Sequence, residues 1–405
     1  MMNEATRQFI RAHQEDDIRQ LALRGTKDPE VDLAFALQQI DGRKRAQEKL
    51  PSWAAIEGIV WPPHLSMEQC SSERTARYKA EVAGSGESFV DLTVGFGVDA
   101  AFIAKGFQRA VCVELQPELC AVSKENFTLL GLQQIEMVNG NGVDYLHTMA
   151  PADLIFIDPA RRDEHGGRTY GIADCTPNVL EMIDELLAKA QRVMIKLSPM
   201  LDWRKAVDDI GSQHVTAVHI VSVNNECKEL VVEVKRGKGE EVKVVCVNLL
   251  SDGSEERFEF DAQSSSAPLH PSTSLPFHSF TLSPFHFLYL PNASLMKAGC
   301  FDLLASRYGV VQADVNSHLF YSDRQVESFP GRGFVIERVT SMNKRDLKEA
   351  LSGISQANVA VRNFPMSAVE LRRRLKLRDG GDTYIFATTV ANKGHQLFIC
   401  RKISN

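Results

Sequence analysis

An acidic residue and two glycines stand close together in the segment Phe89-Val-Asp-Leu-Thr-Val-Gly-Phe-Gly-Val-Asp99. Glycines in such a turn let the backbone approach a bound ligand, and the N-terminus of a following helix supplies free N–H donors. Glu114 follows Gly95 by about 20 residues, the spacing at which a carboxylate binds ribose hydroxyls in nucleotide-binding sheets. The pattern Gly95-x-Gly97-x-x-Ala100 therefore predicts a nucleotide-like ligand, and by itself it fits both nicotinamide dinucleotides and S-adenosylmethionine.

Three neighbouring features favour S-adenosylmethionine. Asp91 lies inside an apolar run, where it can accept a hydrogen bond from the ammonium group of that donor, whereas a dinucleotide needs no acid there. The run Asn139-Gly-Asn-Gly142 offers polar groups to an adenine edge. Asp158 and Pro159 end the apolar run Leu154-Ile-Phe-Ile, so they are predicted at the carboxyl end of a strand, which faces the ligand crevice of such sheets.

After residue 88, short apolar runs alternate with helical stretches, and this alternation is typical of a parallel sheet built from βα units. It predicts the elements that position these residues. The predicted strands are Phe89–Leu92, Ala110–Glu114, Ile135–Val138, Leu154–Asp158 and Val193–Leu197, and the predicted helices lie at about 98–105, 117–130, 143–149 and 177–190. The β-rich runs 215–223 and 229–234 are joined by too few residues for a helical crossover, so they predict an antiparallel hairpin. The predicted fold class is α/β, a Rossmann-like doubly wound sheet with an antiparallel terminal strand.

Taken in order, residues 89–99, Glu114, Asn141 and 158–161 resemble the successive motifs of class I S-adenosylmethionine-dependent methyltransferases. The glycine turn and the Asp-Pro-Ala-Arg turn are similar to those of enzymes that methylate exocyclic amines of nucleic-acid bases, including RNA cap guanine-N2 enzymes. In those enzymes the second turn is usually Asp/Asn/Ser-Pro-Pro followed by an aromatic residue. This chain has Ala160 and Arg161 instead, and an arginine plane stacks on a base or pairs with a phosphate.

The resemblance implies a set of site residues and a direct displacement, in which Asp158 and the carbonyl of Pro159 accept hydrogen bonds from the target amine. No metal is expected. The residues expected to be catalytic are Asp158, Pro159 and Arg161; those expected to bind the cofactor S-adenosylmethionine are Asp91, Thr93, Gly95, Gly97, Asp99, Glu114, Leu115, Asn141 and Gly142; those expected to bind substrate are Arg162, Lys196, Ser198, Arg372, Arg373 and Arg374. Cys175 lacks the surrounding motif of a cytosine-C5 nucleophile.

The C-terminal part of the chain carries a second resemblance. Residues 364–389, with the run Ser71-Ser-Glu-Arg-Thr-Ala-Arg-Tyr-Lys79, resemble an uncharacterised bacterial methyltransferase family that has a THUMP-like C-terminal domain. THUMP domains are RNA-binding modules of tRNA-modifying enzymes. Residues 331–405 hold 14 basic and 6 acidic side chains, although the whole chain has a net charge of −6. Because phosphate contacts act locally, this basic segment predicts RNA, a tRNA or rRNA, as the partner.

Length and composition set the remaining expectations. With 405 residues and 44% hydrophobic side chains, the chain is long enough for several domains with real cores. The predicted division is a helical N-terminal domain (1–83), a methyltransferase domain (84–235), a small α/β ferredoxin-like domain (236–330) and a basic THUMP-like domain (331–405). The Ser- and Pro-rich stretch 264–284 is predicted to be a long loop or a disordered insert.

No apolar run is long enough to span a membrane, no secretory signal is recognisable, and the eight scattered cysteines form no Cys-x-x-Cys motif. A cytoplasmic protein with reduced thiols and no membrane partner is therefore expected. The function expected is N-methylation of a base in structured RNA. The alternatives are a methyltransferase of a small molecule or a protein, a non-catalytic RNA-binding protein, and a nicotinamide oxidoreductase.

Overall fold

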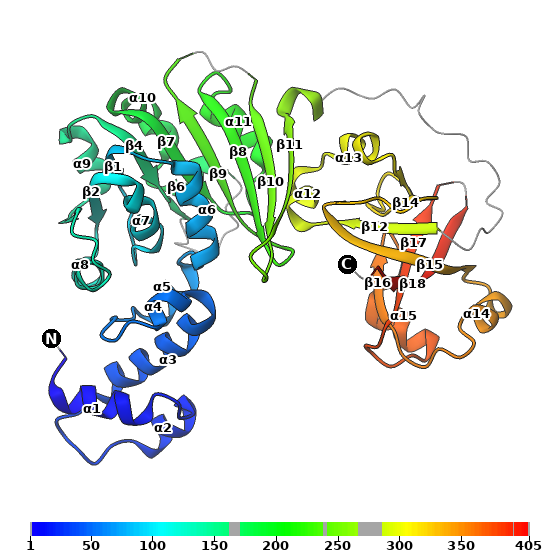
Figure 1. Cartoon of the computed structure of the whole chain (residues 1–405), viewed down its shortest axis with the longest axis horizontal. Coiled ribbons are helices and arrows are strands. Elements are labelled where there is room, and N and C mark those ends of the chain that lie inside the picture. The colour runs from blue at the N-terminus through cyan, green and yellow to red at the C-terminus, as the bar shows by residue number, and fades with distance from the viewer. Residues whose placement is uncertain (1, 162–170, 238–240, 266–285, 392, 404–405) are drawn as a thin grey trace. The chain divides into compact units, whose positions relative to one another are not determined.

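The protein is described here by a computed structural model, in which residues 2–161, 171–237, 241–265, 286–391 and 393–403 are placed (Figure 1). Two compact units are present. The first comprises residues 1–218 and 229–242, and the second comprises residues 219–228 and 243–405. The predicted substrate residue Arg162 and most of the Ser- and Pro-rich stretch 264–284 lie outside the described residues. Within the described ranges, no helix combines the length and the apolarity needed to cross a membrane.

The first unit begins with the helices that the sequence predicts for residues 1–80. They are α1 (Glu4–His13), α2 (Ile18–Arg24), α3 (Leu33–Lys49), α4 (Pro51–Ala54), α5 (His64–Gln69) and α6 (Glu73–Ala83). Four of them start at a polar side chain, of Asn3, Asp17, Asp32 or Ser72, that accepts a hydrogen bond from a backbone N–H of the first turn. Such caps satisfy donors that have no partner inside the helix, which fixes where each helix begins.

A parallel sheet follows, and its strands confirm the predicted ones. Its strands are β1 (Gly86–Asp91), β2 (Phe107–Glu114), β3 (Ile135–Asn139), β4 (Ala152–Ile157) and β7 (Ala190–Leu197), and its helices are α7 (Val98–Ile103), α8 (Pro117–Leu129), α9 (Gly142–Thr148) and α10 (Val179–Lys189). The strands pair in parallel in the order β3-β2-β1-β4-β7. All five end at the same edge of the sheet, so the polar residues that follow them are brought together there.

The predicted hairpin is formed by β8 (Val215–Val223) and β9 (Glu226–Lys235), after helix α11 (Trp203–Ile210). Asn224 and Asn225 have φ angles of 48° and 66°, as a tight hairpin turn with two left-handed residues requires. Strand β9 pairs antiparallel with β7, and the full strand order is β11-β10-β8-β9-β7-β4-β1-β2-β3. The antiparallel strand is therefore β9, and the sheet continues beyond it.

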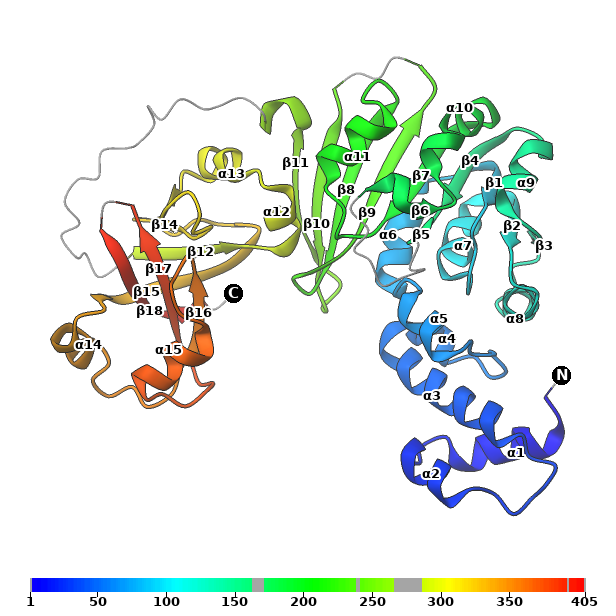
Figure 2. The ribbon, with the colours of Figure 1, turned by 180° about the vertical axis from the view of Figure 1, so that it is seen from behind.

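The N-terminal helices and the glycine turn after β1 share one hydrophobic core. The ring centroids of Trp53 and Trp61 lie 5.3 and 6.2 Å from that of Phe96, the residue between the two glycines. The buried amide of Asn126 on α8 donates to the carbonyl of Val60 and accepts from its N–H, both at 2.9 Å. In both views α6 runs beside α7 (Figures 1 and 2). The N-terminal helices therefore fix the conformation of the turn.

The second unit contains a seven-stranded sheet of order β13-β14-β12-β15-β18-β17-β16. Its elements are β12 (His286–Pro291), α12 (Ala293–Ala298), α13 (Phe301–Tyr308), β13 (Val311–Gln312), β14 (Phe320–Ser322), β15 (Gly331–Ser341), α14 (Lys344–Ala350), β16 (Asn358–Arg362), α15 (Ala368–Leu375), β17 (Thr383–Val390) and β18 (Gly394–Lys402). Helices α12 and α13 are separate, because Gly299 takes a left-handed conformation (φ 68°) at the end of α12.

Strands β10 (Lys243–Leu249) and β11 (Glu255–Asp261) pair with each other in the nine-stranded sheet. By contrast β12, β13 and β14 belong to the seven-stranded sheet, in which β12 pairs with β15. The strands of segment 236–330 are thus divided between two sheets. The division into four domains stays a prediction.

Candidate active site

The glycine turn connects β1 to α7 and has the shape that its sequence predicts. Gly95 and Gly97 have φ angles of 57° and 83°, a region that favours glycine. A Cβ atom at Gly97 would lie 2.5 Å from the ring of Phe127, whereas a Cβ atom at Gly95 would meet no atom within 4 Å. Gly97 is therefore required for packing against α8, while Gly95 faces open space.

Asp91 is the last residue of β1 and is buried, with 1% of its surface exposed. Its Oδ1 accepts a hydrogen bond of 2.9 Å from the N–H of Thr93. Its Oδ2 is buried and has no hydrogen-bond partner among the described residues. Burial raises the pKa of Asp91 well above its ordinary value, and the nearby carboxylates of Asp99 and Asp158 raise it further. A buried acceptor without a partner is costly, so this atom is suited to a cationic ligand group.

The ends of β2 and β3 form the next part of the site. Glu114 is buried, and its two oxygens accept hydrogen bonds from the N–H groups of Gly95 (2.9 Å) and Gln116 (2.8 Å). Asn139 donates to the carbonyl of Glu114 at 2.8 Å, which ties the two strand ends together. Gly142 lies so close to the loop after β1 that a Cβ atom would come within 2.1 Å of the carbonyl oxygen of Leu92. These contacts fix the glycine turn relative to Glu114.

Asn141 and Leu115 lie beside them with exposed side chains. Asn141 caps α9 by accepting from the N–H of Val143 at 2.8 Å. Leu115 is 67% exposed, which leaves an apolar side chain next to the carboxylate of Glu114. An exposed apolar side chain and a polar one at this edge are suited to the face and the edge of a base.

Asp158 directly follows β4, and its backbone is held by the glycine-turn segment. Its N–H donates to Oγ1 of Thr93 at 2.7 Å. Its Oδ2 forms an ion pair with the ammonium group of Lys196 on the adjacent strand β7. Its side chain remains 37% exposed, and Oδ1 has no partner within the described parts of the chain. One carboxylate oxygen is therefore anchored, and the other is accessible.

Lys196 is itself part of a buried network of charges that runs beneath the site. Its ammonium group lies 3.5 Å from Oδ2 of Asp99 on α7, and Oδ1 of Asp99 lies 3.1 Å from the ammonium group of Lys79 on α6. Lys79 is fully buried, and it also contacts Glu229 of β9 at 2.5 Å and the hydroxyl of Ser71 at 3.1 Å. The chain Glu229–Lys79–Asp99–Lys196–Asp158 thus connects four elements and ends at the accessible carboxylate.

The pKa shifts in this network follow from burial and from opposite charges. Burial alone would raise the pKa of Asp99, but Lys79 and Lys196 hold it below its ordinary value. Burial alone would lower the pKa of Lys196, but Asp158, Asp99 and Glu229 raise it above its ordinary value. Burial raises the pKa of Glu229, and Lys79 opposes this rise. Lys196 therefore keeps its positive charge more firmly than an ordinary lysine, and that charge lies against the carboxylate of Asp158.

The remaining predicted residues have different surroundings. Pro159 is buried beside Asp158, and the backbone of Arg161 lies in the short strand β5 (Ala160–Arg161), which pairs with β6 (Cys175–Thr176). Ser198 closes the turn after β7 by accepting from the N–H of Met200 at 3.3 Å. The residues Arg372, Arg373 and Arg374 lie on α15 in the second unit.

Sequence reasoning missed Ser71, Lys79 and Glu229. The signal for Lys79 is its place in the buried stripe of α6 with Thr75, Ala76 and Ala83, positions three to four residues apart.

Three features of the structure match the chemical groups of S-adenosylmethionine at the residues predicted to bind it. The partnerless Oδ2 of Asp91 is an acceptor for an ammonium group, Gly95 faces open space, and Glu114 ends β2 where ribose hydroxyls bind. In addition, the network contains three carboxylates, of Glu229, Asp99 and Asp158, and two lysines, so it has an excess of negative charge that a donor with ammonium and sulfonium groups offsets.

We expect Asp91→Asn to weaken binding of S-adenosylmethionine by about 10- to 100-fold, the usual worth of a charge-assisted hydrogen bond. Because the pKa of Asp91 is raised, its carboxyl stays protonated to a higher pH than usual, so donor affinity should increase as the pH rises through that pKa. The variant should lose this increase. Calorimetric titration at a series of pH values measures both effects, with Glu87→Gln, an exposed acid on the same strand, as control. Equal affinities for the variant and the wild type would contradict the role of Asp91.

Comparison with known proteins agrees with this geometry. Residues 331–402 match a THUMP domain-like family model, residues 287–330 match a ferredoxin-like domain model, and residues 79–163 match the model of protein-L-isoaspartate(D-aspartate) O-methyltransferases. A curated protein-L-isoaspartate O-methyltransferase of Picosynechococcus sp. is 30% identical over 145 residues, which are 35% of this chain. The match spans 63% of the length of that relative.

Two solved structures complete the comparison. One, from Porphyromonas gingivalis W83 and assigned as a methyltransferase, is 30% identical, and the alignment covers 100% of both chains with a TM-score of 0.86. The other, an rRNA methylase from Streptococcus thermophilus, is 17% identical and covers 41% of this chain and 96% of its own, with a TM-score of 0.31. Fold and site together define a class I S-adenosylmethionine-dependent methyltransferase. The chain belongs to the same methyltransferase family as the Porphyromonas gingivalis protein, and it carries a THUMP-like C-terminal region.

Proposed function

We propose that this methyltransferase methylates an exocyclic amine of a base, such as guanine N2, in structured RNA. The observation that carries the proposal is the Asp158-Pro159 turn at the end of β4, in which one carboxylate oxygen is anchored by Lys196 and the other is accessible. A target amine has N–H groups to donate, and the free Oδ1 of Asp158 and the carbonyl of Pro159 are acceptors for them.

The donor is held by residues at the carboxyl ends of β1, β2 and β3. Asp91 would bind the ammonium group, the backbone N–H groups near Gly95 and Gly97 would contact the donor, and Glu114 would bind the ribose hydroxyls. Leu115, Asn141 and Gly142 would surround the adenine base of the donor. When bound, S-adenosylmethionine supplies an electrophilic methyl group on its sulfonium sulfur. Thr93 and Asp99 act indirectly, because Thr93 holds the N–H of Asp158 and Asp99 holds Lys196.

The chain contributes position and desolvation to the transfer. The amine nitrogen attacks the methyl carbon in line, so that the C–N bond forms as the C–S bond breaks and the electron pair remains on sulfur. The nitrogen loses one proton as positive charge develops on it, and Oδ1 of Asp158 is placed to accept that proton. Lys196 keeps the carboxylate oriented throughout because it holds Oδ2. Arg161 and Arg162 are proposed to contact the substrate from the segment after β4.

RNA is proposed as the substrate because of the THUMP-like match and the charge of the C-terminal residues. Helix α15 carries Arg372, Arg373 and Arg374, of which Arg372 pairs with Asp379. Arg373 and Arg374 are exposed. Exposed guanidinium groups on one helix are suited to phosphate oxygens.

The experiment that tests the function is transfer of labelled methyl from S-adenosylmethionine into tRNA, rRNA, DNA and protein fractions from cells that lack this protein. Label in one RNA fraction is the expected result, and nucleoside analysis of that fraction identifies the base. Label confined to protein, or no label in any of these fractions, would contradict the proposal.

We expect Arg373→Ala/Arg374→Ala to weaken RNA binding about equally for all sequences. The slope of the logarithm of the binding constant against the logarithm of the salt concentration should fall by about one to two, the loss of one or two phosphate contacts. The matched control is Arg345→Ala/Lys348→Ala on α14, which removes the same charge from the same segment. Filter binding at several salt concentrations measures the slope. An identical slope for the two double variants would contradict the role of α15.

A second candidate is methylation of a protein carboxylate, because residues 79–163 match the isoaspartate O-methyltransferase model. This match includes Asp91, Glu114 and Asp158, so it covers the donor side and the turn after β4. It is tested in the protein fraction of the same labelling experiment. Base-labile label in that fraction, with none in RNA, would favour it.

A further inference from the structure

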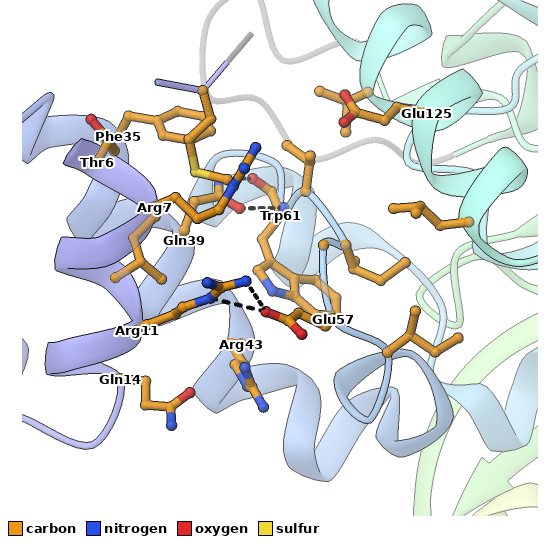
Figure 3. A pocket seen from close by; sticks show the side chains of 18 of the residues that line it. Thr6, Arg7, Arg11, Gln14, Phe35, Gln39, Arg43, Glu57, Trp61 and Glu125 are labelled. Atoms are coloured by element: carbon orange, nitrogen blue, oxygen red, sulfur yellow. Dashed lines mark hydrogen bonds and ion pairs between the residues drawn. The ribbon is translucent and has the colours of Figure 1, made fainter. Parts of the chain in front are cut away.

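A cavity of about 910 Å³ lies in the first unit between α1, α3, α8 and the loop 56–61 (Figure 3). It is distinct from the residues that hold the donor, since none of Asp91, Glu114 and Asp158 lines it. Neither the methyl-transfer site nor the THUMP-like region uses this cavity.

One wall of the cavity is basic. Phe35, Gln39 and Arg43 are four residues apart on α3, so they form one stripe of that helix. Arg7 and Arg11 line the cavity from α1, and Figure 3 shows that the three guanidinium groups come from these two helices.

These guanidinium groups are available to a ligand. Arg11 pairs with Glu57, and Arg7 pairs with Glu4, but all four side chains are at least 46% exposed. Such exposed pairs contribute little to stability, so a phosphate can replace the carboxylate. Arg43 is half-buried and forms no ion pair within the described chain.

The remaining lining combines apolar residues of the loop and of α8 with three acids, Asp32, Glu57 and Glu125, so the cavity has as many acidic as basic side chains. Ile59 and Trp61 of the loop are buried, with 7% and 3% of their surface exposed, whereas Leu129 of α8 is 42% exposed. Glu125, also on α8, faces the cavity from the side opposite the arginines (Figure 3). Guanidinium groups next to apolar side chains are the combination that binds a phosphate and the flat face of a base together.

The cavity is connected to the donor site through its loop. Gln39 holds Trp61 by donating to its carbonyl (2.9 Å) and accepting from its N–H (2.7 Å), and the ring of Trp61 contacts Phe96 in the glycine turn. The loop that lines the cavity is therefore packed against the glycine turn.

We propose that this cavity binds a nucleotide of the substrate RNA, with its phosphate at Arg7, Arg11 and Arg43 and its base against the apolar side of the cavity. This inference rests on the proposed function, since it takes the substrate to be RNA. It adds a second RNA contact, on the N-terminal helices, to the one proposed on α15.

The test uses Arg7→Ala/Arg43→Ala, with Arg19→Ala/Arg24→Ala on α2 as a charge-matched control outside the cavity. Binding of the full-length protein to the RNA fraction that accepts methyl, or to total tRNA, is measured by fluorescence anisotropy at several salt concentrations. Binding of S-adenosylmethionine is measured by calorimetry in parallel. Cross-linking of the wild type to RNA that contains 4-thiouridine, followed by peptide mapping, provides a readout that needs no variant.

The expected result is an RNA affinity at least about 10-fold lower for the cavity variant, a salt slope reduced by about one to two, and less than a 2-fold change for the control. Donor affinity should be unchanged in both, and cross-links should include residues 54–61 or α3. RNA affinities equal for the two variants, or cross-links confined to the second unit, would overturn the proposal while RNA remains the substrate. No RNA binding by the wild type, with donor binding intact, would overturn the proposed RNA function and this inference with it.

Discussion

Asp158→Ala is expected to lower the rate of methyl transfer by about 10²- to 10⁴-fold, the usual contribution of a positioned acid–base group. The variant loses the acceptor for the target amine and for its proton. It should bind S-adenosylmethionine as the wild type does, because the residues proposed to hold the donor lie at the ends of β1, β2 and β3. Labelled-methyl transfer into the accepting fraction measures the rate, and calorimetry measures donor binding.

The fold should survive this change, because Lys196 keeps Asp99 as a partner at 3.5 Å. Asp208→Ala is the matched control, since Asp208 is an exposed acid on α11. Asp158→Asn separates charge from hydrogen bonding, because the amide keeps an acceptor oxygen but loses the ion pair with Lys196. Retention of full activity by Asp158→Ala would remove Asp158 from the catalytic residues.

Lys79→Met is expected to lower the free energy of unfolding by about 3–5 kcal/mol, as removal of one partner of a buried ion pair does. Lys79 is fully buried between Asp99 and Glu229, so its loss leaves the carboxylate of Glu229 without its cation. Denaturation with urea, followed by circular dichroism, measures the change. Arg45→Met, which removes a partly exposed pair with Asp41 on α3, is expected to cost less than about 1 kcal/mol.

The double variant Lys79→Met/Glu229→Gln tests whether the cost comes from the unpaired charge. Without the negative charge of Glu229, most of the lost stability should return. A double variant that is as unstable as Lys79→Met would show instead that packing of the lysine stem dominates. If the network positions Asp158, the double variant should also transfer methyl more slowly although it is stable, because Asp99 no longer holds Lys196 from a fixed position.

The relative positions of the residues predicted to bind the donor could be derived from the sequence because they are local. Asp91, Gly95 and Gly97 lie within one strand-to-helix turn, and Glu114 is at the end of the next strand, so spacing alone placed them at one edge of the sheet. The network beneath them could not be predicted in this way. Lys79 and Glu229 are far apart in the sequence, and only the tertiary fold brings α6 against β9.

The fold shows the same division between local and non-local information. The parallel strands and the hairpin were predicted from apolar runs and from a connection too short for a crossover. The partners of β10, β11 and β12 were not, since strand pairing depends on which edges meet in the folded chain. No pattern within residues 236–330 indicates that their strands belong to two different sheets.

The packing of Trp53 and Trp61 on Phe96 has a consequence for how this enzyme is related to others that use the same donor. A module that only touched the surface of the catalytic domain could be exchanged without disturbing that domain. Here the N-terminal helices contribute side chains to the core beneath the glycine turn, so their replacement would alter the donor pocket itself. The N-terminal and donor-binding segments are therefore constrained to change together, and a graft of either one alone should yield a protein that binds neither ligand well.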